Sequence, residues 1–378
     1  MKFVICPDSF KESLSSKDVS LAIRSGLSSS FPNAEYDLIP LSDGGEGFID
    51  VLVESLNGNI EHTKVIGPLG DEIPAKYGYI AKEKKAIIEI AEACGLTLVP
   101  KEFRNPSKTT TYGVGQLILN ALNKGAVEIL VGLGGSSTND GGLGMFIALG
   151  AKALDENGIE IKSFSNILSK VKSIDISSLD KRLSETKIEI ACDVKNPLLG
   201  ENGATHIFSP QKGADESMVL ELEESMKNYN EIIEKAFFKK ISNMPGSGAA
   251  GGLGYAFCAL GYNLINGIDL VLRHSHFEER IKDCDFIITG EGAIDEASIN
   301  GKVISGVSSI ARKYDKPVIA FTGKICDKLS DLYEIGVTSI FSITDSPKSL
   351  DEALKSCEKS LKKASLNLGR LILRAYKN

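Results

Sequence analysis

Hydrophobic and polar positions follow two recurring patterns along this chain: short apolar runs, and longer segments in which apolar residues recur every three or four positions. The first pattern predicts buried strands, and the second predicts helices that bury one face. At the amino terminus, a predicted strand over 2–7 precedes a helix over 16–27, and a strand over 36–41 precedes a helix over 48–56. This alternation is typical of the β-α units of a parallel sheet.

The alternation stops between residues 59 and 91, where three strands are predicted without a helix between them, and it returns near the carboxyl terminus. The later predicted strands are 127–131, 187–192, 283–289, 317–322 and 337–343, and the later helices are 145–154, 215–238, 302–314 and 350–375. We therefore expect an α/β fold with two domains. Residues 1–60 plus 284–378 would form a doubly wound, flavodoxin- or Rossmann-like parallel-sheet domain, with a mixed α/β domain, 61–283, inserted in it.

The composition is that of an ordinary globular protein. The chain has 378 residues, of which 42% are hydrophobic and 25% charged, and its longest apolar runs have the length of a strand rather than of a membrane span. The amino terminus enters a strand at once and leaves no room for a signal peptide. The 7 cysteines are scattered and form no Cys-x-x-Cys pair. We expect a cytoplasmic protein with reduced thiols and no membrane association.

Charge and histidine content exclude two further classes of function. The net charge is -7, and no basic run extends beyond pairs such as Lys239-Lys240. Because nucleic-acid binding requires a positive surface, we expect no nucleic-acid partner. His274 and His276 are the only close histidine pair, and two residues that far apart on a helix do not share a face. A dedicated zinc site is therefore not expected.

A glycine-rich loop from Gly132 to Gly144 follows the predicted strand 127–131 and precedes a predicted helix. Glycines allow the backbone to approach a ligand closely, and backbone N–H groups at a helix start favour an anion. Ser136, Ser137 and Asn139 add short hydrogen-bonding side chains. An ordinary capped turn is the alternative. We favour a phosphate or nucleotide site.

Polar residues also follow several predicted strands, where open parallel sheets bind their ligands. They are Asp8, Ser9, Lys11, Asp43, Glu46, Asp193, Glu291 and Asp295. Carboxylates at such positions can bind Mg²⁺ or accept a proton from a substrate hydroxyl, although helix capping and solvated turns are the simpler alternatives. We expect an interdomain cleft to gather Asp8, Asp43, Glu291 and Asp295.

The sequence argues against two common nucleotide-binding motifs. The segment 246–251 matches Gly-x-Gly-x-x-Gly in form, but the residues before it make a poor strand, which argues against a dinucleotide site. Neither Gly301-Lys302 nor Gly323-Lys324 has the Ser or Thr and the upstream glycine of a Walker A motif.

Six segments together resemble a known family. In chain order they are Pro7-Asp8-Ser9-Phe10-Lys11-Glu12-Ser13, Ser42-Asp43-Gly44-Gly45-Glu46-Gly47, Gly134-Gly135-Ser136-Ser137-Thr138-Asn139-Asp140-Gly141-Gly142, Ala191-Cys192-Asp193-Val194, Pro210-Gln211-Lys212-Gly213-Ala214 and Thr289-Gly290-Glu291-Gly292. This set resembles the bacterial glycerate kinases that lack a P-loop, glycerate 2-kinases in particular, from the first strand to the last helix. The family commonly has arginine where this chain has Ala293, and its loop pattern differs over 296–300.

The resemblance implies ATP-dependent phosphorylation of D-glycerate with Mg²⁺, giving 2-phosphoglycerate in preference to 3-phosphoglycerate. Its catalytic residues would be Asp8, Lys11, Asp43 and Asp193, with Asp43 and Asp193 also as Mg²⁺ ligands. Its substrate- and phosphate-binding residues would be Ser9, Glu46, Gly134, Gly135, Ser136, Ser137, Asn139, Asp140, Glu291, Asp295 and Lys302. A kinase for another small hydroxy-acid and a non-catalytic sugar-acid or nucleotide sensor are the alternatives, and a homodimer stays open.

Overall fold

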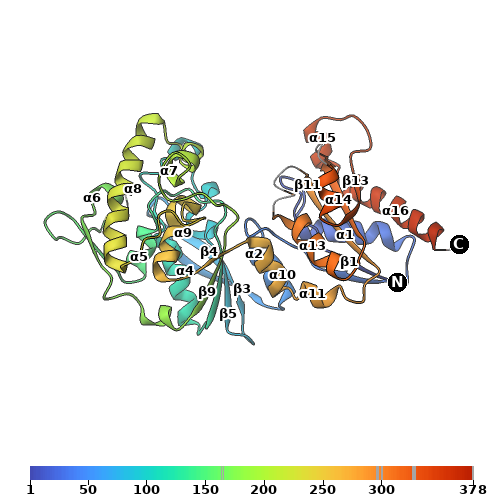
Figure 1. Cartoon of the computed structure of the whole chain (residues 1–378), viewed down its shortest axis with the longest axis horizontal. Helices are drawn as coiled ribbons and strands as arrows, with labels where there is room; N and C mark the ends of the chain where they lie inside the picture. The colour runs from blue at the N-terminus through green and yellow to red at the C-terminus, as the bar shows by residue number, and fades with distance from the viewer. Residues whose placement is uncertain (163, 165, 295–297, 299–300, 326–328, 377–378) are drawn as a thin grey trace. The chain divides into compact units, whose positions relative to one another are not determined.

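The structure is a computed structural model that describes residues 1–162, 164, 166–294, 298, 301–325 and 329–376 (Figure 1). Contacts divide the chain into unit 1 (Met1–Asp43, Asp50–Leu56 and Asn266–Asn378) and unit 2 (Gly44–Ile49 and Asn57–Ile265). The division predicted from the sequence placed residues 61–283 together. The contacts instead assign helices α10 (Gly267–His274) and α11 (Phe277–Arg280) to unit 1.

Unit 1 is built on a five-stranded sheet in the order β13-β12-β11-β1-β2. Its strands are β1 (Lys2–Ile5), β2 (Glu35–Leu38), β11 (Phe286–Ala293), β12 (Val318–Lys324) and β13 (Val337–Ser342), and all neighbours are parallel. Numbered along the chain, this order is the flavodoxin-like 2-1-3-4-5. The predicted doubly wound sheet is therefore confirmed. Its strand order reverses between β1 and β11, which is the point where such sheets bind ligands.

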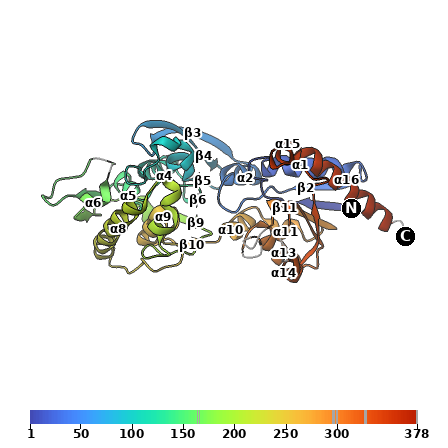
Figure 2. The same cartoon turned by 90° about the horizontal axis from the view of Figure 1, so that it is seen from above.

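Helices cover both faces of the unit 1 sheet (Figure 2). On one face, α1 (Ser16–Ser28) and α16 (Cys357–Ala375) pack against alternate strand residues such as Phe3 and Ile5. On the other face, α13 (Val303–Lys313) and α14 (Leu329–Glu334) pack around Ala320 and Val337. Burial on both faces explains why these strands have continuous apolar runs rather than alternating ones.

The predicted helix over 350–375 is two helices in the structure. The first, α15 (Leu350–Lys355), begins with a capping box between Ser349 and Glu352. Ser356 ends α15 and precedes α16, and its hydroxyl donates to the backbone oxygen of Glu352 at 2.7 Å. The N–H of Ser356 donates to the same oxygen at 3.0 Å, so both hydrogen bonds close the last turn of α15.

Unit 2 contains a six-stranded mixed sheet in the order β10-β9-β6-β5-β4-β3. An antiparallel meander, β3 (Asn59–Ile66), β4 (Glu72–Ile80) and β5 (Lys85–Glu89), is followed by the parallel strands β6 (Glu128–Gly132), β9 (Lys187–Ala191) and β10 (Leu264–Ile265). Its core lies between the sheet and α4 (Tyr112–Asn123), α5 (Leu143–Ala148), α8 (Glu216–Phe237) and α9 (Ala249–Leu260). This is the predicted mixed α/β domain.

The helix predicted over 145–154 is wrong in its second half. Helix α5 ends at Ala148, and β7 (Lys152–Leu154) pairs with β8 (Ser173–Asp175). Gly150 has a φ of 108°, a left-handed conformation that stops helices and that glycine adopts without strain. Apolar spacing alone did not reveal that stop.

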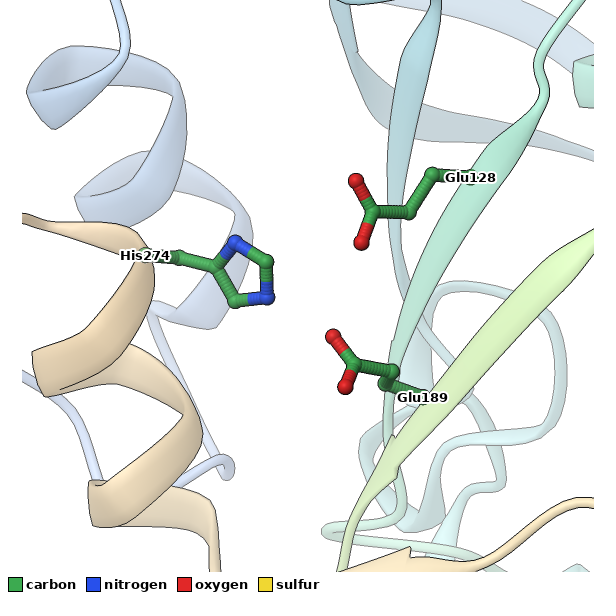
Figure 3. Close-up of side chains that lie close together, drawn as sticks. All are labelled: Glu128, Glu189 and His274. Carbon is green, nitrogen blue, oxygen red and sulfur yellow. The ribbon is translucent and has the colours of Figure 1, made fainter.

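Two carboxylates in the unit 2 sheet, the half-buried Glu128 and the buried Glu189, belong to an ion-pair network. Glu128 on β6 and Glu189 on β9 point to the same side of neighbouring strands (Figure 3). Lys187 Nζ lies 2.7 Å from a Glu128 oxygen and 3.1 Å from a Glu189 oxygen, and Lys85 Nζ lies 3.3 Å from the other Glu128 oxygen. The third residue in Figure 3, His274, lies on α10 of unit 1. The two lysines give these glutamates a structural role in the sheet.

Among the described helices, none has the length and apolarity that a membrane crossing requires.

Candidate active site

A cavity of about 440 Å³ lies in unit 1 at the carboxyl ends of its strands. Three acidic residues after the strands line it: Asp8 after β1, Asp43 after β2, and Glu291 near the end of β11. Four lysines line the same cavity: Lys11, Lys302, Lys324 and Lys348. The cavity therefore combines hard oxygen ligands with several cations at the switch point of the sheet.

Backbone pairing carries these acids beyond the ends of the strands. The N–H of Asp8 donates to the backbone oxygen of Gly290 at 2.8 Å, which extends the β1–β11 ladder by several residues. On the other side, the N–H of Leu41 donates to the oxygen of Pro7 at 2.9 Å and extends the β1–β2 pairing toward Asp43. The positions of the acids are consequently fixed by the sheet rather than by freely moving loops.

The pKa of Asp8 is strongly perturbed in this cavity. The Asp8 side chain is 7% exposed, and the N–H of Ser9 donates to its Oδ1 at 2.6 Å. Burial, and then repulsion from the negative charges of Asp43 and Glu291, raise the pKa of Asp8 to about 7, against the opposing effects of the Ser9 N–H and Lys11. A carboxyl group with a pKa near neutrality can both take up and release a proton at physiological pH.

Two of the cavity lysines were not identified from the sequence. Lys324 ends β12 and pairs in register with Ala293 of β11, the position at which the sequence departs from the family that it resembles. Lys348 donates to Asp345 at 2.9 Å and lies before α15. Lys324 follows a predicted strand as Lys11 does, so the criterion that identified Lys11 applies to it as well.

The glycine-rich loop lies in unit 2, after β6. Ser136, Ser137, Asn139 and Asp140 are all at least nine-tenths buried, whereas Gly135 is exposed and Gly134 half-buried. Gly135 has a φ of 73°. No described residue accepts a hydrogen bond from the N–H groups of Gly134, Gly135 or Ser136. Successive N–H groups around a left-handed residue are a common anion-binding arrangement.

The second half of the loop is fixed by the protein itself. Asp140 accepts hydrogen bonds from the N–H and hydroxyl of Thr111 and from the N–H groups of Gly142 and Gly144. Burial raises the pKa of Asp140 in spite of these bonds. Asn139 donates to the hydroxyl of Thr205 at 3.1 Å. These contacts give Asp140 and Asn139 the geometry of a scaffold for the loop.

Several glycines of this loop serve packing within unit 2. A Cβ at Gly141 would overlap the ring of Tyr229, one at Gly142 would overlap Ala256, and one at Gly144 would overlap the hydroxyl of Thr110. At Gly135, in contrast, the nearest atom to a Cβ is 3.7 Å away. The accessible backbone of the loop is therefore confined to its beginning.

The remaining predicted site residues are distributed as follows. Ser9 lines the unit 1 cavity beside Asp8. Glu46 and Asp193 both belong to unit 2 and are exposed, and Asp193 lies just beyond the end of β9. Asp295 lies outside the described residues.

Comparison with known proteins gives one family. The model of the glycerate kinase family matches residues 3–373. The chain is 46% identical to the glycerate 2-kinase of Escherichia coli, with 100% of each chain covered, and 45% identical to the glycerate kinase of Halalkalibacterium halodurans, with 97% and 96% covered. A crystal structure of a protein from Salmonella typhimurium, provisionally assigned as glycerate kinase 2, matches with a TM-score of 0.90, 42% identity and 100% coverage of both chains. The chain therefore belongs to the glycerate kinase family and is a phosphotransferase.

Proposed function

We propose that the protein transfers the γ-phosphoryl group of ATP to the 2-hydroxyl group of D-glycerate. The observation that carries this proposal is the cavity of unit 1, where Asp8, Asp43 and Glu291 meet several lysines at the switch point of a flavodoxin-like sheet. Phosphoryl transfer needs positioning, charge neutralisation and an acceptor for one proton, and little covalent chemistry from the protein. This cavity contains residues suited to each of those tasks.

Asp8 is the proposed proton acceptor. A general base is most effective when its pKa lies near the working pH, and the pKa of Asp8 is raised to about 7. In this role its carboxylate takes the proton from the glycerate hydroxyl as that oxygen attacks the γ-phosphorus. The hydrogen bond from the Asp8 N–H to the backbone oxygen of Gly290 fixes the backbone of Asp8. The hydrogen bond from the Ser9 N–H to Oδ1 orients its carboxylate.

The same cavity fits Mg²⁺ by the chemistry of its donors. Asp43 and Glu291 offer the carboxylate oxygens that hard cations prefer, and the repulsion that raises the pKa of Asp8 is the kind that a bound cation relieves. We propose Asp43 as a Mg²⁺ ligand and Glu291 as a residue that would contact the phosphates through that ion, since a carboxylate and a phosphate repel each other directly. Bound Mg²⁺ would neutralise charge on the phosphates. Asp193, just beyond the end of β9, is separately proposed as a Mg²⁺ ligand of unit 2.

Cations and backbone N–H groups would bind the two anionic substrates. The carboxylate of glycerate needs a fixed counter-charge, because burying it unpaired would be costly. We propose that Lys11 and Lys302 bind this carboxylate or the transferring phosphate. The family commonly has arginine at the position of Ala293, and we propose that Lys324 supplies the positive charge here. In unit 2, the N–H groups of Gly134, Gly135 and Ser136 are proposed to bind phosphate oxygens.

The choice of the 2-hydroxyl rests on similarity. The Escherichia coli relative, which is covered along its whole length, is named a glycerate 2-kinase. Transfer to the 3-hydroxyl would keep the same residues and change only how glycerate docks.

A substrate panel tests the proposed acceptor. With ATP and Mg²⁺, ADP release is measured for D-glycerate, L-glycerate, glycolate, lactate and tartronate. We expect the highest kcat/KM for D-glycerate. A higher value for another hydroxy-acid would reassign the substrate, and ADP release with none of them would favour a sensor.

Asp43→Asn tests the proposed metal ligand. We expect the Mg²⁺ concentration for half-maximal activity to rise by at least about tenfold and turnover to fall, because an amide is a weaker ligand for a hard cation than a carboxylate. Mg²⁺ titrations of activity at saturating ATP make the measurement. Asp71→Asn is the matched control, since Asp71 is an exposed residue in the β3–β4 turn. An unchanged Mg²⁺ requirement in Asp43→Asn would remove Asp43 from the metal site.

A further inference from the structure

A lysine lies buried beneath the glycine-rich loop. Lys212 is 2% exposed, and its Nζ donates to the hydroxyl of Ser136 at 3.0 Å and to the backbone oxygen of Thr138 at 2.7 Å. It ends the short 3-10 turn Pro210–Lys212, and the next residue, Gly213, has a φ of 98° that turns the chain away. The ammonium group therefore contacts the loop from inside the protein.

This ammonium group has no ion-pair partner in the described part of the chain, where no carboxylate oxygen lies within 4.0 Å of it. Asp140, the carboxylate whose charge acts on Lys212, accepts its hydrogen bonds from Thr111, Gly142 and Gly144. Burial of an ammonium group without a direct ion pair costs free energy, and an apolar side chain could fill the same space without that cost. The charge of Lys212 is therefore best explained by an anion that arrives from outside.

The place for that anion is the exposed beginning of the loop. Ser136, whose hydroxyl accepts from Lys212, follows Gly134 and Gly135, whose N–H groups have no acceptor among the described residues. We propose that Lys212 is a positioning residue of a phosphate site: it holds Ser136 and Thr138 in place and puts a buried positive charge behind the N–H groups that bind a nucleotide phosphate. The inference rests on the proposed function, in which this loop binds phosphate.

The protonation of Lys212 should then be coupled to phosphate binding. Burial lowers the pKa of Lys212 to about 8, against the opposing effects of Cys94 and Asp140, which are the titratable groups facing it. Burial raises the pKa of the Cys94 thiol to about 12, so this group is neutral at pH 8. A phosphate bound nearby favours the charged ammonium, so nucleotide binding at pH 8 should take up part of one proton onto Lys212.

The coupling predicts a pH dependence of affinity with a definite sign. Below about pH 7 Lys212 carries its proton in both the free and the bound protein, and affinity is independent of pH on this account. Above pH 8 the free protein loses that proton, so the affinity for nucleotide falls, by up to about tenfold per pH unit.

Titration calorimetry with the Mg²⁺ complex of a non-hydrolysable ATP analogue tests the inference. The titrations are made at pH 8 in two buffers with different ionisation enthalpies, so that the difference in heat reports proton uptake. We expect uptake for the wild-type protein. Lys212→Met should show none and bind at least about tenfold more weakly, since it lacks the charge-assisted contribution. Lys212→Arg, which stays charged, should recover affinity without the proton uptake.

Lys239→Met is the matched control, because Lys239 Nζ donates to a backbone oxygen, that of Ala259 at 2.9 Å, in another part of unit 2. It should bind like the wild-type protein. Wild-type affinity together with wild-type proton uptake in Lys212→Met would overturn the inference. If Lys212→Met does not fold, the titration of the wild-type protein is sufficient. Nucleotide binding without proton uptake at pH 8 would overturn the inference about Lys212 and would not contradict the proposed function. A wild-type protein that binds no nucleotide would instead refute the proposed function.

Discussion

We expect Asp8→Asn to lower kcat by about 10²–10⁴-fold, the range by which a positioned general base accelerates a reaction. The amide keeps the shape of the side chain and can still accept from the N–H of Ser9, so the loss reports the missing base rather than a moved loop. Steady-state kinetics with saturating ATP and Mg²⁺ make the measurement, with Asp71→Asn as the control. Activity within a factor of about three of the wild type would exclude Asp8 as the base.

The pH dependence of the wild-type protein should agree with this role. The ratio kcat/KM reports the ionisation of the free enzyme. Because Asp8 must be ionised to accept a proton and its pKa is raised to about 7, kcat/KM should fall as the pH drops through 7. A profile that stays flat down to pH 5 would contradict the assignment.

The same substitution should stabilise the protein without Mg²⁺. The pKa of Asp8 is raised in the folded state, so its ionisation is easier in the unfolded chain. Below about pH 4 Asp8 is protonated in the folded and the unfolded protein alike, so the difference in pKa leaves the free energy of unfolding unchanged. As the pH rises from about 4 through 7, the free energy of unfolding decreases. Asp8→Asn removes that loss. At pH 8 its Tm should exceed that of the wild type, which would show that its low activity does not come from unfolding.

Gly141→Ala is the substitution with the largest expected effect on stability. Gly141 has a φ of 62°, and a Cβ there would overlap the ring of Tyr229, which is fully buried. The left-handed backbone costs about 1–2 kcal/mol for alanine, and overpacking in a rigid core adds about 1–3 kcal/mol. We therefore expect the free energy of unfolding to fall by about 2–5 kcal/mol.

Gly125→Ala separates the two contributions. Gly125 also has a positive φ, 92°, but a Cβ there has no neighbouring atom within 4 Å. It should lose only the backbone contribution of about 1–2 kcal/mol. Urea denaturation of both variants measures the difference. Equal losses in the free energy of unfolding would show that the ring of Tyr229 moves aside without loss of stability.

The sheet of unit 1 was predictable because its strands are buried on both faces. Their continuous apolar runs and the polar residues that follow them, such as Asp8 and Glu291, are visible in the sequence alone. The boundary near α10 was not, because α10 packs on unit 1 although it follows the last strand of unit 2 along the chain. Only contacts distant in sequence decide to which unit such a helix belongs.

The glycine-rich loop shows a different limit of sequence reasoning. Its composition favours close approach of the backbone, but the sequence does not say what approaches. At Gly141 and Gly142 it is the protein's own Tyr229 and Ala256. The loop's buried cation was missed for the same reason: Lys212 is indistinguishable in sequence from an exposed lysine, and only its burial against Ser136 reveals it.

The most direct test of the central claim is a phosphorus NMR spectrum of the purified protein incubated with ATP, Mg²⁺ and D-glycerate. We expect the resonances of ADP together with that of 2-phosphoglycerate. A resonance of 3-phosphoglycerate would keep the kinase activity and contradict the proposed transfer to the 2-hydroxyl group. Consumption of neither substrate by folded protein would contradict the proposed function itself.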